Sequence, residues 1–248
     1  MLRGLVTALR TLTILPVPGR DAEKFSSSLH WFTVAGLLIG AVEAGMAMLG
    51  MLAGWPELAA LLPVLAGIAL TRGLHADGLA DLADGFFGGR NRESILRIMK
   101  DPNVGSFGAI ALILLFLSKW VVLLRLVHYG GYAVVASGVI LARMAQVVLA
   151  ERFPYARPEN GTATAFVNGA GPAHLLSALF SGIVIVSLIL RFDLYLSIAL
   201  PVTALASAAG TGLLGKRKIG GVTGDVLGAV SEVTEVAVWM AGALIIGR

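Results

Sequence analysis

The sequence predicts an all-α integral membrane protein: a bundle of about seven transmembrane helices, preceded by an interfacial helix at the N-terminus. Of the 248 residues, 57% are hydrophobic and only 14% are charged, whereas a soluble domain carries about 25% charged residues. Apolar runs of about 20 residues recur along the chain, and that length crosses a bilayer as a helix. No stretch requires a strand or a separate soluble domain, so residues 1–248 are expected to form one membrane-embedded domain.

The predicted elements follow in chain order. Residues 1–15 carry leucines at helical spacing and end at Pro16-Val-Pro18-Gly19, which indicates an interfacial helix rather than a signal peptide. Seven spans follow, and the pattern leaves six or eight open. The predicted spans cover residues 31–53, 58–74, 105–127, 132–150, 174–190, 194–214 and 233–246.

Basic side chains favour one side of the membrane. If the N-terminus is cytoplasmic, the cytoplasmic segments hold fourteen Lys and Arg residues, and the opposite side holds only Arg125, Arg191 and Arg248. This asymmetry predicts a multi-pass protein of the cell (inner) membrane whose polar loops face the cytoplasm. The net charge of +4 is confined to loops, which argues against a nucleic-acid partner. The absence of Cys excludes disulfides and thiolate chemistry.

Three aspartates follow the second predicted span at offsets 0, 4 and 7: Asp77, Asp81 and Asp84. On a helix these offsets fall at about 0°, 40° and −20°, so the three carboxylates share one face. Acids this close repel one another unless a cation or a shared proton compensates them. A single Asp beside Gly is usually a helix cap or a turn, but three in register favour metal or ion binding.

A second acidic region holds Asp225, Glu232 and Glu235, which can also share a helical face. The predicted topology places both acidic regions at cytoplasmic helix ends, where they would meet across one site. Mg²⁺ pairs such carboxylates with substrate phosphates. The sequence therefore predicts a magnesium site.

Basic residues near both acidic regions could bind phosphate oxygens. They are Arg90, Arg92, Arg97, Lys100, Arg157 and the run Lys216-Arg217-Lys218. That run fits a topology-setting charge cluster equally well. Arg143 and Lys119 lie inside predicted spans, where each needs a partner or a water-filled cavity. His75 is more typical of an ordinary polar contact than of a ligand. Together these groups indicate metal-dependent chemistry on a phosphorylated substrate.

Several of these stretches also occur together in a known family. They are Gly73-Leu-His-Ala-Asp-Gly-Leu-Ala-Asp-Leu-Ala-Asp-Gly-Phe-Phe-Gly-Gly89, Ile98-Met-Lys-Asp101, Pro154-Tyr-Ala-Arg-Pro158 and Gly220-Gly-Val-Thr-Gly-Asp-Val-Leu-Gly228. Over nearly its whole length the chain resembles cobalamin-5′-phosphate synthase, also called adenosylcobinamide-GDP ribazoletransferase. Phe86-Phe87 stands where smaller residues are expected, which affects no predicted ligand.

The resemblance implies a Mg²⁺-dependent membrane enzyme that joins adenosylcobinamide-GDP to α-ribazole or its 5′-phosphate and releases GMP. An alcohol oxygen would attack the cobinamide-side phosphorus. Asp77, Asp81 and Asp84 would hold Mg²⁺, with Asp225 and Glu232 completing its shell, and Asp84 would also accept the hydroxyl proton. Phosphate oxygens would be bound by Lys100, Arg157, Arg90, Lys216 and Arg217. The bilayer is the expected environment, and a homo-oligomer stays open.

Two alternatives come from other classes. A CDP-alcohol phosphotransferase also holds aspartates at a membrane face, but its pattern places an Ala-Arg pair after Asp-Gly, where this chain has Leu79-Ala80-Asp81. An ion-coupled transporter would carry acids near the bilayer midplane, often within paired repeats. Here no repeat is detected, and the acids are expected at helix ends.

Overall fold

The computed structural model describes residues 2–157 and 163–247 and confirms the predicted fold class. Within those ranges the only extended pairing is one parallel bridge between Tyr155 and Val222, and no strand forms. In chain order the helices are α1 (Leu2–Leu12), the 3-10 helix η1 (Phe25–Trp31), α2 (Phe32–Leu52), α3 (Pro56–Thr71), α4 (Leu74–Gly88), α5 (Arg92–Ile98), α6 (Ser106–His128), α7 (Tyr132–Arg152), α8 (Thr164–Val167), α9 (Pro172–Ile189), α10 (Leu194–Ile219) and α11 (Gly224–Ile246).

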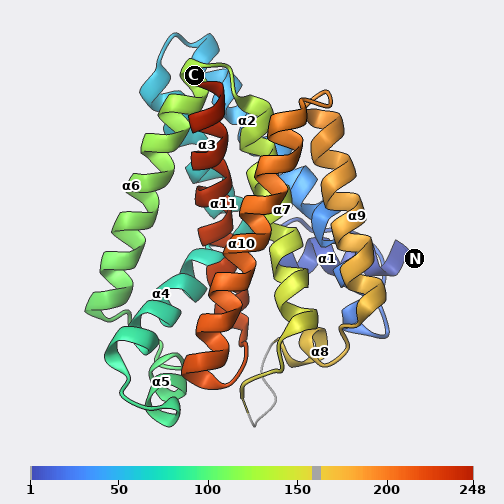
Figure 1. The fold of residues 1–248 in the computed structure, drawn as a ribbon, viewed down its shortest axis with the longest axis vertical. Coiled ribbons are helices and arrows are strands. Elements are labelled where there is room, and N and C mark those ends of the chain that lie inside the picture. Colours follow the sequence, from blue (N-terminus) through green and yellow to red (C-terminus); the bar gives the residue numbers. More distant parts are fainter. Residues whose placement is uncertain (1, 158–162, 248) are drawn as a thin grey trace.

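Six of the described helices are long and apolar enough to cross a membrane, and the bent pair α3–α4 makes seven if it counts as one span. Both counts lie within the predicted range of six to eight spans. The long helices run up and down between two ends (Figure 1). Helices α4, α5 and α8 and the turn between α10 and α11 gather at the lower end, which we call the site end, and the C-terminus lies at the other.

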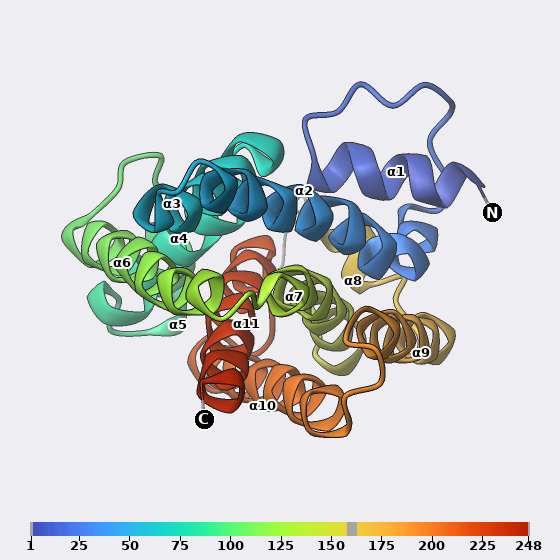
Figure 2. The same ribbon diagram turned by 90° about the horizontal axis from the view of Figure 1, so that it is seen from above.

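Helix α7 is the centre of the bundle. It packs against α2, α9, α10 and α11, and the view along the helices shows it surrounded (Figure 2). Small residues make this close packing feasible, because α2 approaches the α7 backbone at Gly36 and Gly40. Gly138 leaves room for Trp239, whose indole N–H donates to the Val135 carbonyl at 2.9 Å.

A sharp corner separates the second predicted span from the aspartates. Helix α3 ends at Thr71, and α4 leaves at an angle of 89°. Arg72 and Gly73 form the corner with φ values of 55° and 65°, a left-handed conformation that Gly adopts without strain. The sequence predicted that the span would run on to residue 74 and straight into the acidic stretch. That was wrong: α4 turns away from α3 and runs obliquely near the site end, where it packs against α6 and α11 (Figure 1).

The N-terminal helix also lies crosswise to the bundle (Figure 1), as predicted. It ends at Leu12 rather than residue 15 and buries Gly4, Thr7, Ala8 and Leu12. Arg10 fastens the following loop, because its guanidinium pairs with Asp21 at 2.8 Å and donates to two carbonyls in the loop.

The last helix is longer than predicted. Helix α11 begins at Gly224 rather than at residue 233, because Thr223 caps it by accepting a hydrogen bond from the Val226 N–H. The predicted position of the second acidic region is therefore wrong in part. Asp225 lies in the first turn at the site end, but Glu232 and Glu235 lie two to three turns further along, inside the bundle.

Candidate functional site

Helices α4 and α11 bring the two acidic regions together through a pair of glycines. A Cβ atom at Gly78 would lie 2.9 Å from the Asp225 carbonyl oxygen, and one at Gly228 would lie 3.2 Å from the His75 carbonyl oxygen. The two backbones are thus nearly in contact. This approach places Asp77 and Asp81 of α4 beside Asp225 of α11, and we call these three residues the aspartate cluster.

The cluster carries more negative charge than its surroundings compensate. Within the described residues, Asp77 and Asp81 make no side-chain hydrogen bond or ion pair. Partial burial raises the pKa of the Asp81 carboxyl to about 7, and the nearby carboxylates of Asp225 and Asp77 contribute to the rise. A bound cation would stabilise the ionised form of all three.

Arg157 supplies one compensating charge. Its guanidinium donates to the Asp225 carboxylate at 2.7 Å and to the Met99 carbonyl at 3.3 Å. The Thr223 hydroxyl donates to the same carboxylate at 3.1 Å. Arg157 is half-buried and lies within reach of the aspartate cluster, so the structure brings together four of the predicted site residues: Asp77, Asp81, Asp225 and Arg157.

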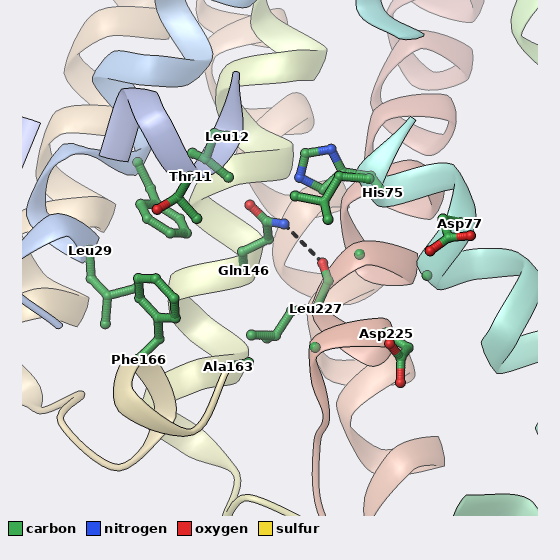
Figure 3. Close-up of a pocket in the computed structure, with 15 residues that line it drawn as sticks. Thr11, Leu12, Leu29, His75, Asp77, Gln146, Ala163, Phe166, Asp225 and Leu227 are labelled. Carbon is green, nitrogen blue, oxygen red and sulfur yellow. Dashed lines mark hydrogen bonds between the residues drawn. The ribbon is translucent and has the colours of Figure 1, made fainter. Parts of the chain in front are cut away.

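Two cavities meet at Asp77. The first, of about 240 Å³, lies between α1, α4, α7 and α11 and includes Asp77 and Asp225 in its wall. Figure 3 shows both aspartates on one side of this cavity, with Leu29 and Phe166 across from them. The second, of about 570 Å³, is bounded by the end of α1 and the corner after α3, and its wall includes Arg10, Arg72 and Asp77.

Asp84 has a different place from the one the sequence suggested. Its two carboxylate oxygens accept hydrogen bonds from the backbone N–H groups of Gly105 and Gly108, at 2.7 and 2.9 Å. These are donors that the first turn of α6 leaves without helical partners. Asp84 is buried and holds α4 against the start of α6, so its oxygens are engaged in a cap. Its predicted roles as metal ligand and base stay predictions, and the contacts favour a structural role.

The remaining predicted phosphate-binding residues lie around the site end without reaching either cavity wall. Arg90, Lys100, Lys216 and Arg217 are exposed. Two neighbouring basic residues are used in packing instead. Lys218 donates to the Phe86 carbonyl at 3.0 Å, and Arg92 donates to the carbonyls of Ile219 and Ala156 at 2.8 and 2.6 Å. They fasten the end of α10 to α4 and α5.

A second charged group, the inner ion-pair cluster, lies inside the bundle. It consists of Glu43, Lys119, Arg143, Glu232 and Glu235, all buried. The Lys119 ammonium pairs with Glu232 at 2.6 Å and with Glu235 at 2.5 Å, and Arg143 donates to the Ser231 hydroxyl. Glu232 is therefore occupied by an ion pair away from the aspartate cluster, which disfavours the predicted metal-ligand role.

Sequence reasoning overlooked Gln146 and gave too little weight to His75. Both side chains are buried and line the first cavity. Gln146 lies within the apolar sequence of α7, and a polar residue in a span is the one signal that could have found it. The N-terminal residues Arg10 and Thr11 were assigned to an interfacial helix, and only the fold shows that they line cavities.

The donor set suits Mg²⁺ bound together with a phosphate. Within the described residues, no three carboxylate or imidazole groups are gathered closely enough to hold a metal ion by themselves. Mg²⁺ commonly keeps several waters and uses one or two carboxylates plus substrate phosphates. Asp77 and Asp81, whose carboxylates have no other partner among residues 2–157 and 163–247, fit that mode.

Known proteins similar to this chain identify its family. The family model of cobalamin-5-phosphate synthase matches residues 4–243. An adenosylcobinamide-GDP ribazoletransferase from Chlorobaculum parvum is 62% identical over 244 residues, 98% of this chain and 96% of the relative. Proteins of the same name from Chlorobaculum tepidum and Syntrophobacter fumaroxidans are 60% and 38% identical, over 98% and 96% of this chain and 96% of each relative. No solved structure matches the chain.

Proposed function

The chain belongs to the cobalamin-5-phosphate synthase family and is an enzyme of cobalamin synthesis, and from this membership we propose its reaction and site. It transfers the adenosylcobinamide-phosphate group from adenosylcobinamide-GDP to α-ribazole or its 5′-phosphate, and GMP leaves. Family membership favours this reaction over a CDP-alcohol phosphotransfer or ion transport. The observation that carries the site is the meeting of Asp77, Asp81 and Asp225 beside two cavities that share Asp77 in their walls.

Asp77 and Asp81 would hold Mg²⁺ together with the diphosphate of the donor substrate, and Asp225, which Arg157 engages, lies beside them. Bound there, the ion would supply positive charge to neutralise the diphosphate and the departing GMP. Arg157 keeps the Asp225 carboxylate in place and offers its guanidinium to a phosphate oxygen. Transfer of this kind depends on positioning and charge neutralisation more than on a covalent nucleophile, which agrees with a site built from carboxylates and a guanidinium.

The basic residues outside the cavities serve the approach of the donor substrate. Arg90, Lys100, Lys216 and Arg217 are exposed at the site end, and a field of positive charge attracts an anionic diphosphate before it binds. Neutralising Lys216 and Arg217 together should raise the KM for adenosylcobinamide-GDP at low ionic strength and leave kcat unchanged.

The site end faces the cytoplasm, because it carries most of the basic residues of the loops. The chain has no cysteine, so a single cysteine can report its side of the membrane. Glu93 lies at the site end and Phe192 in the turn between α9 and α10, so Glu93→Cys and Phe192→Cys each place one cysteine at a different end of the bundle. In intact spheroplasts, a membrane-impermeant maleimide should label only the Phe192→Cys protein. The reverse pattern would overturn the orientation.

The reaction is tested by GMP release. The purified protein in nanodiscs, supplied with adenosylcobinamide-GDP and α-ribazole, should release GMP with Mg²⁺ present and stop when EDTA is added. Asp77→Asn should lose most of this activity, whereas Glu93→Gln, an exposed acid on the neighbouring α5, should keep it. GMP release that is unaffected by EDTA would contradict the magnesium assignment.

A further inference from the structure

The first cavity is divided by polarity. Its wall on the α4 and α11 side carries the Asp77 and Asp225 carboxylates, while the opposite wall is formed by apolar side chains that include Leu12, Leu29 and Phe166 (Figure 3). A ligand that fits this division has an apolar, ring-shaped end and a polar end. The polar end would face the carboxylates.

Gln146 projects into the middle of this cavity (Figure 3). Its side chain is only 4% exposed, and its amide nitrogen donates to the Leu227 carbonyl at 3.0 Å. Because a carbonyl can only accept, this bond fixes which end of the amide carries the oxygen. The oxygen, Oε1, is buried and has no partner among the described residues. Buried acceptors are nearly always satisfied, so Oε1 is placed for a ligand that donates a hydrogen bond.

The size and chemistry of the cavity select among the parts of the two substrates. Pockets that enclose a whole drug-sized ligand measure about 300–1,000 Å³, so a cavity of about 240 Å³ takes a bicyclic ring with part of a sugar and excludes a corrin ring. Guanine would bring a polar edge with several donors and acceptors into an apolar wall, where most would lack partners. The dimethylbenzimidazole base of ribazole has no N–H group once it is attached to ribose, so an apolar wall suits it.

We propose that this cavity binds the acceptor substrate, with the benzimidazole base against Leu29 and Phe166 and the ribose beside Gln146. The inference rests on the proposed function and adds the location of the acceptor to it. A ribose hydroxyl donates to Gln146 Oε1, and the ribose extends toward Asp77 and Asp225, where the diphosphate of the other substrate is held. The two substrates thus meet at the aspartate cluster from different cavities.

Filling the cavity tests the position of the base. Ala163 lines the apolar wall, and Ala163→Leu replaces its methyl group with an isobutyl group. Small volume changes in an apolar pocket alter recognition by about 10–200-fold. The KM for α-ribazole should rise at least about tenfold, and the KM for adenosylcobinamide-GDP should stay within about twofold. The matched control is Ala165→Leu, which is exposed on α8, two positions after Ala163, and does not line the cavity.

A binding measurement separates the base from the sugar and does not depend on turnover. Calorimetry would compare α-ribazole with 1,5,6-trimethylbenzimidazole, in which a methyl group replaces the ribose. Gln146→Leu should lower the affinity for α-ribazole by about three- to tenfold, which corresponds to the loss of one hydrogen bond. Its affinity for the methylated base should not change. Ala163→Leu should lower the affinity for both ligands.

The outcomes distinguish the two proposals. The cavity assignment is wrong, although transfer continues, if Ala163→Leu folds and keeps both KM values. It is also wrong if Gln146→Leu lowers the affinity for the methylated base as much as the affinity for α-ribazole. If the unmodified protein releases no GMP with α-ribazole, the proposed function itself fails. If Ala163→Leu does not fold, the comparison of Gln146→Leu with the unmodified protein is sufficient. Equal affinity of these two proteins for α-ribazole would overturn the assignment.

Discussion

The aspartate cluster and the inner ion-pair cluster contain acids from the same helix but differ in how their charges are balanced. In the inner cluster, Lys119 is held between Glu232 and Glu235, and no part of it reaches either cavity at the site end. In the aspartate cluster, Asp77 and Asp81 have no hydrogen-bond or ion-pair partner in the part of the chain that the structure describes, and Asp77 borders both cavities. Acids whose charge is balanced within the protein stabilise packing, whereas acids left unbalanced beside a cavity are available to a ligand.

Position along α11 accounts for the difference. Asp225 lies in the first turn, and Glu232 is seven residues further on, about 10 Å along the axis. That distance moves a carboxylate from the site end into the bundle, where an unpaired charge is costly. Four substitutions test this contrast, and their expected effects decrease from Lys119→Met to Asp84→Asn.

The largest effect is expected from Lys119→Met, on stability. Removing the ammonium leaves Glu232 and Glu235 buried without their shared partner, and breaking a buried pair costs about 3–5 kcal/mol. The free energy of unfolding, from denaturant titration in detergent, should fall by that amount. Adding Glu232→Gln and Glu235→Gln to Lys119→Met should recover much of the loss. A fully stable single variant would contradict the balanced-charge description.

Asp81→Asn should affect activity and spare the fold. If Asp81 holds the cation, losing its carboxylate removes several kcal/mol of transition-state stabilisation, so GMP release should fall about 10²–10³-fold. The midpoint of thermal unfolding should not fall, because the carboxylate has no partner among the described residues and is partly desolvated. Unchanged transfer with unchanged Mg²⁺ dependence would rule out Asp81 as a metal ligand.

Arg157→Lys should have an intermediate effect. The charge remains, but the ammonium cannot donate to the Asp225 carboxylate and the Met99 carbonyl with the same fork geometry. Loss of that positioning should reduce kcat by about tenfold, comparable to mutation of a group that orients a metal ligand. Steady-state kinetics with both substrates would show it, and Arg152→Lys, an exposed arginine at the end of α7, is the control.

Asp84→Asn should have the smallest effect, and it separates the two roles considered for this residue. If Asp84 caps α6, its amide still accepts one of the two backbone hydrogen bonds, and stability should fall by about 1–2 kcal/mol. GMP release measured well below the unfolding temperature should stay within a few-fold of the parent. Complete loss of transfer with no loss of stability would restore Asp84 as a catalytic group.

Much of the fold could be predicted from the sequence, because apolar runs and basic loops report directly on the membrane. The bounds of α6, α7, α9 and α10 agree with the predicted spans to within a few residues at most ends, although α10 runs five residues further. The corner at Arg72 and Gly73 could not be predicted, since a left-handed pair of residues carries no strong signature when one of them is Arg. The early start of α11 was missed because its first turns are rich in Gly and polar residues.

The membrane class, the common helical face of Asp77, Asp81 and Asp84, and the resemblance to a family can all be inferred from the order of residues alone. The surroundings of each acid depend on how distant helices pack. Asp225 joins Asp77 and Asp81 because Gly78 and Gly228 let two helices touch, Asp84 caps α6, and Glu232 pairs with Lys119. These partners lie between 21 and 150 positions away along the chain, so periodicity, which compares near neighbours, contains no information about them.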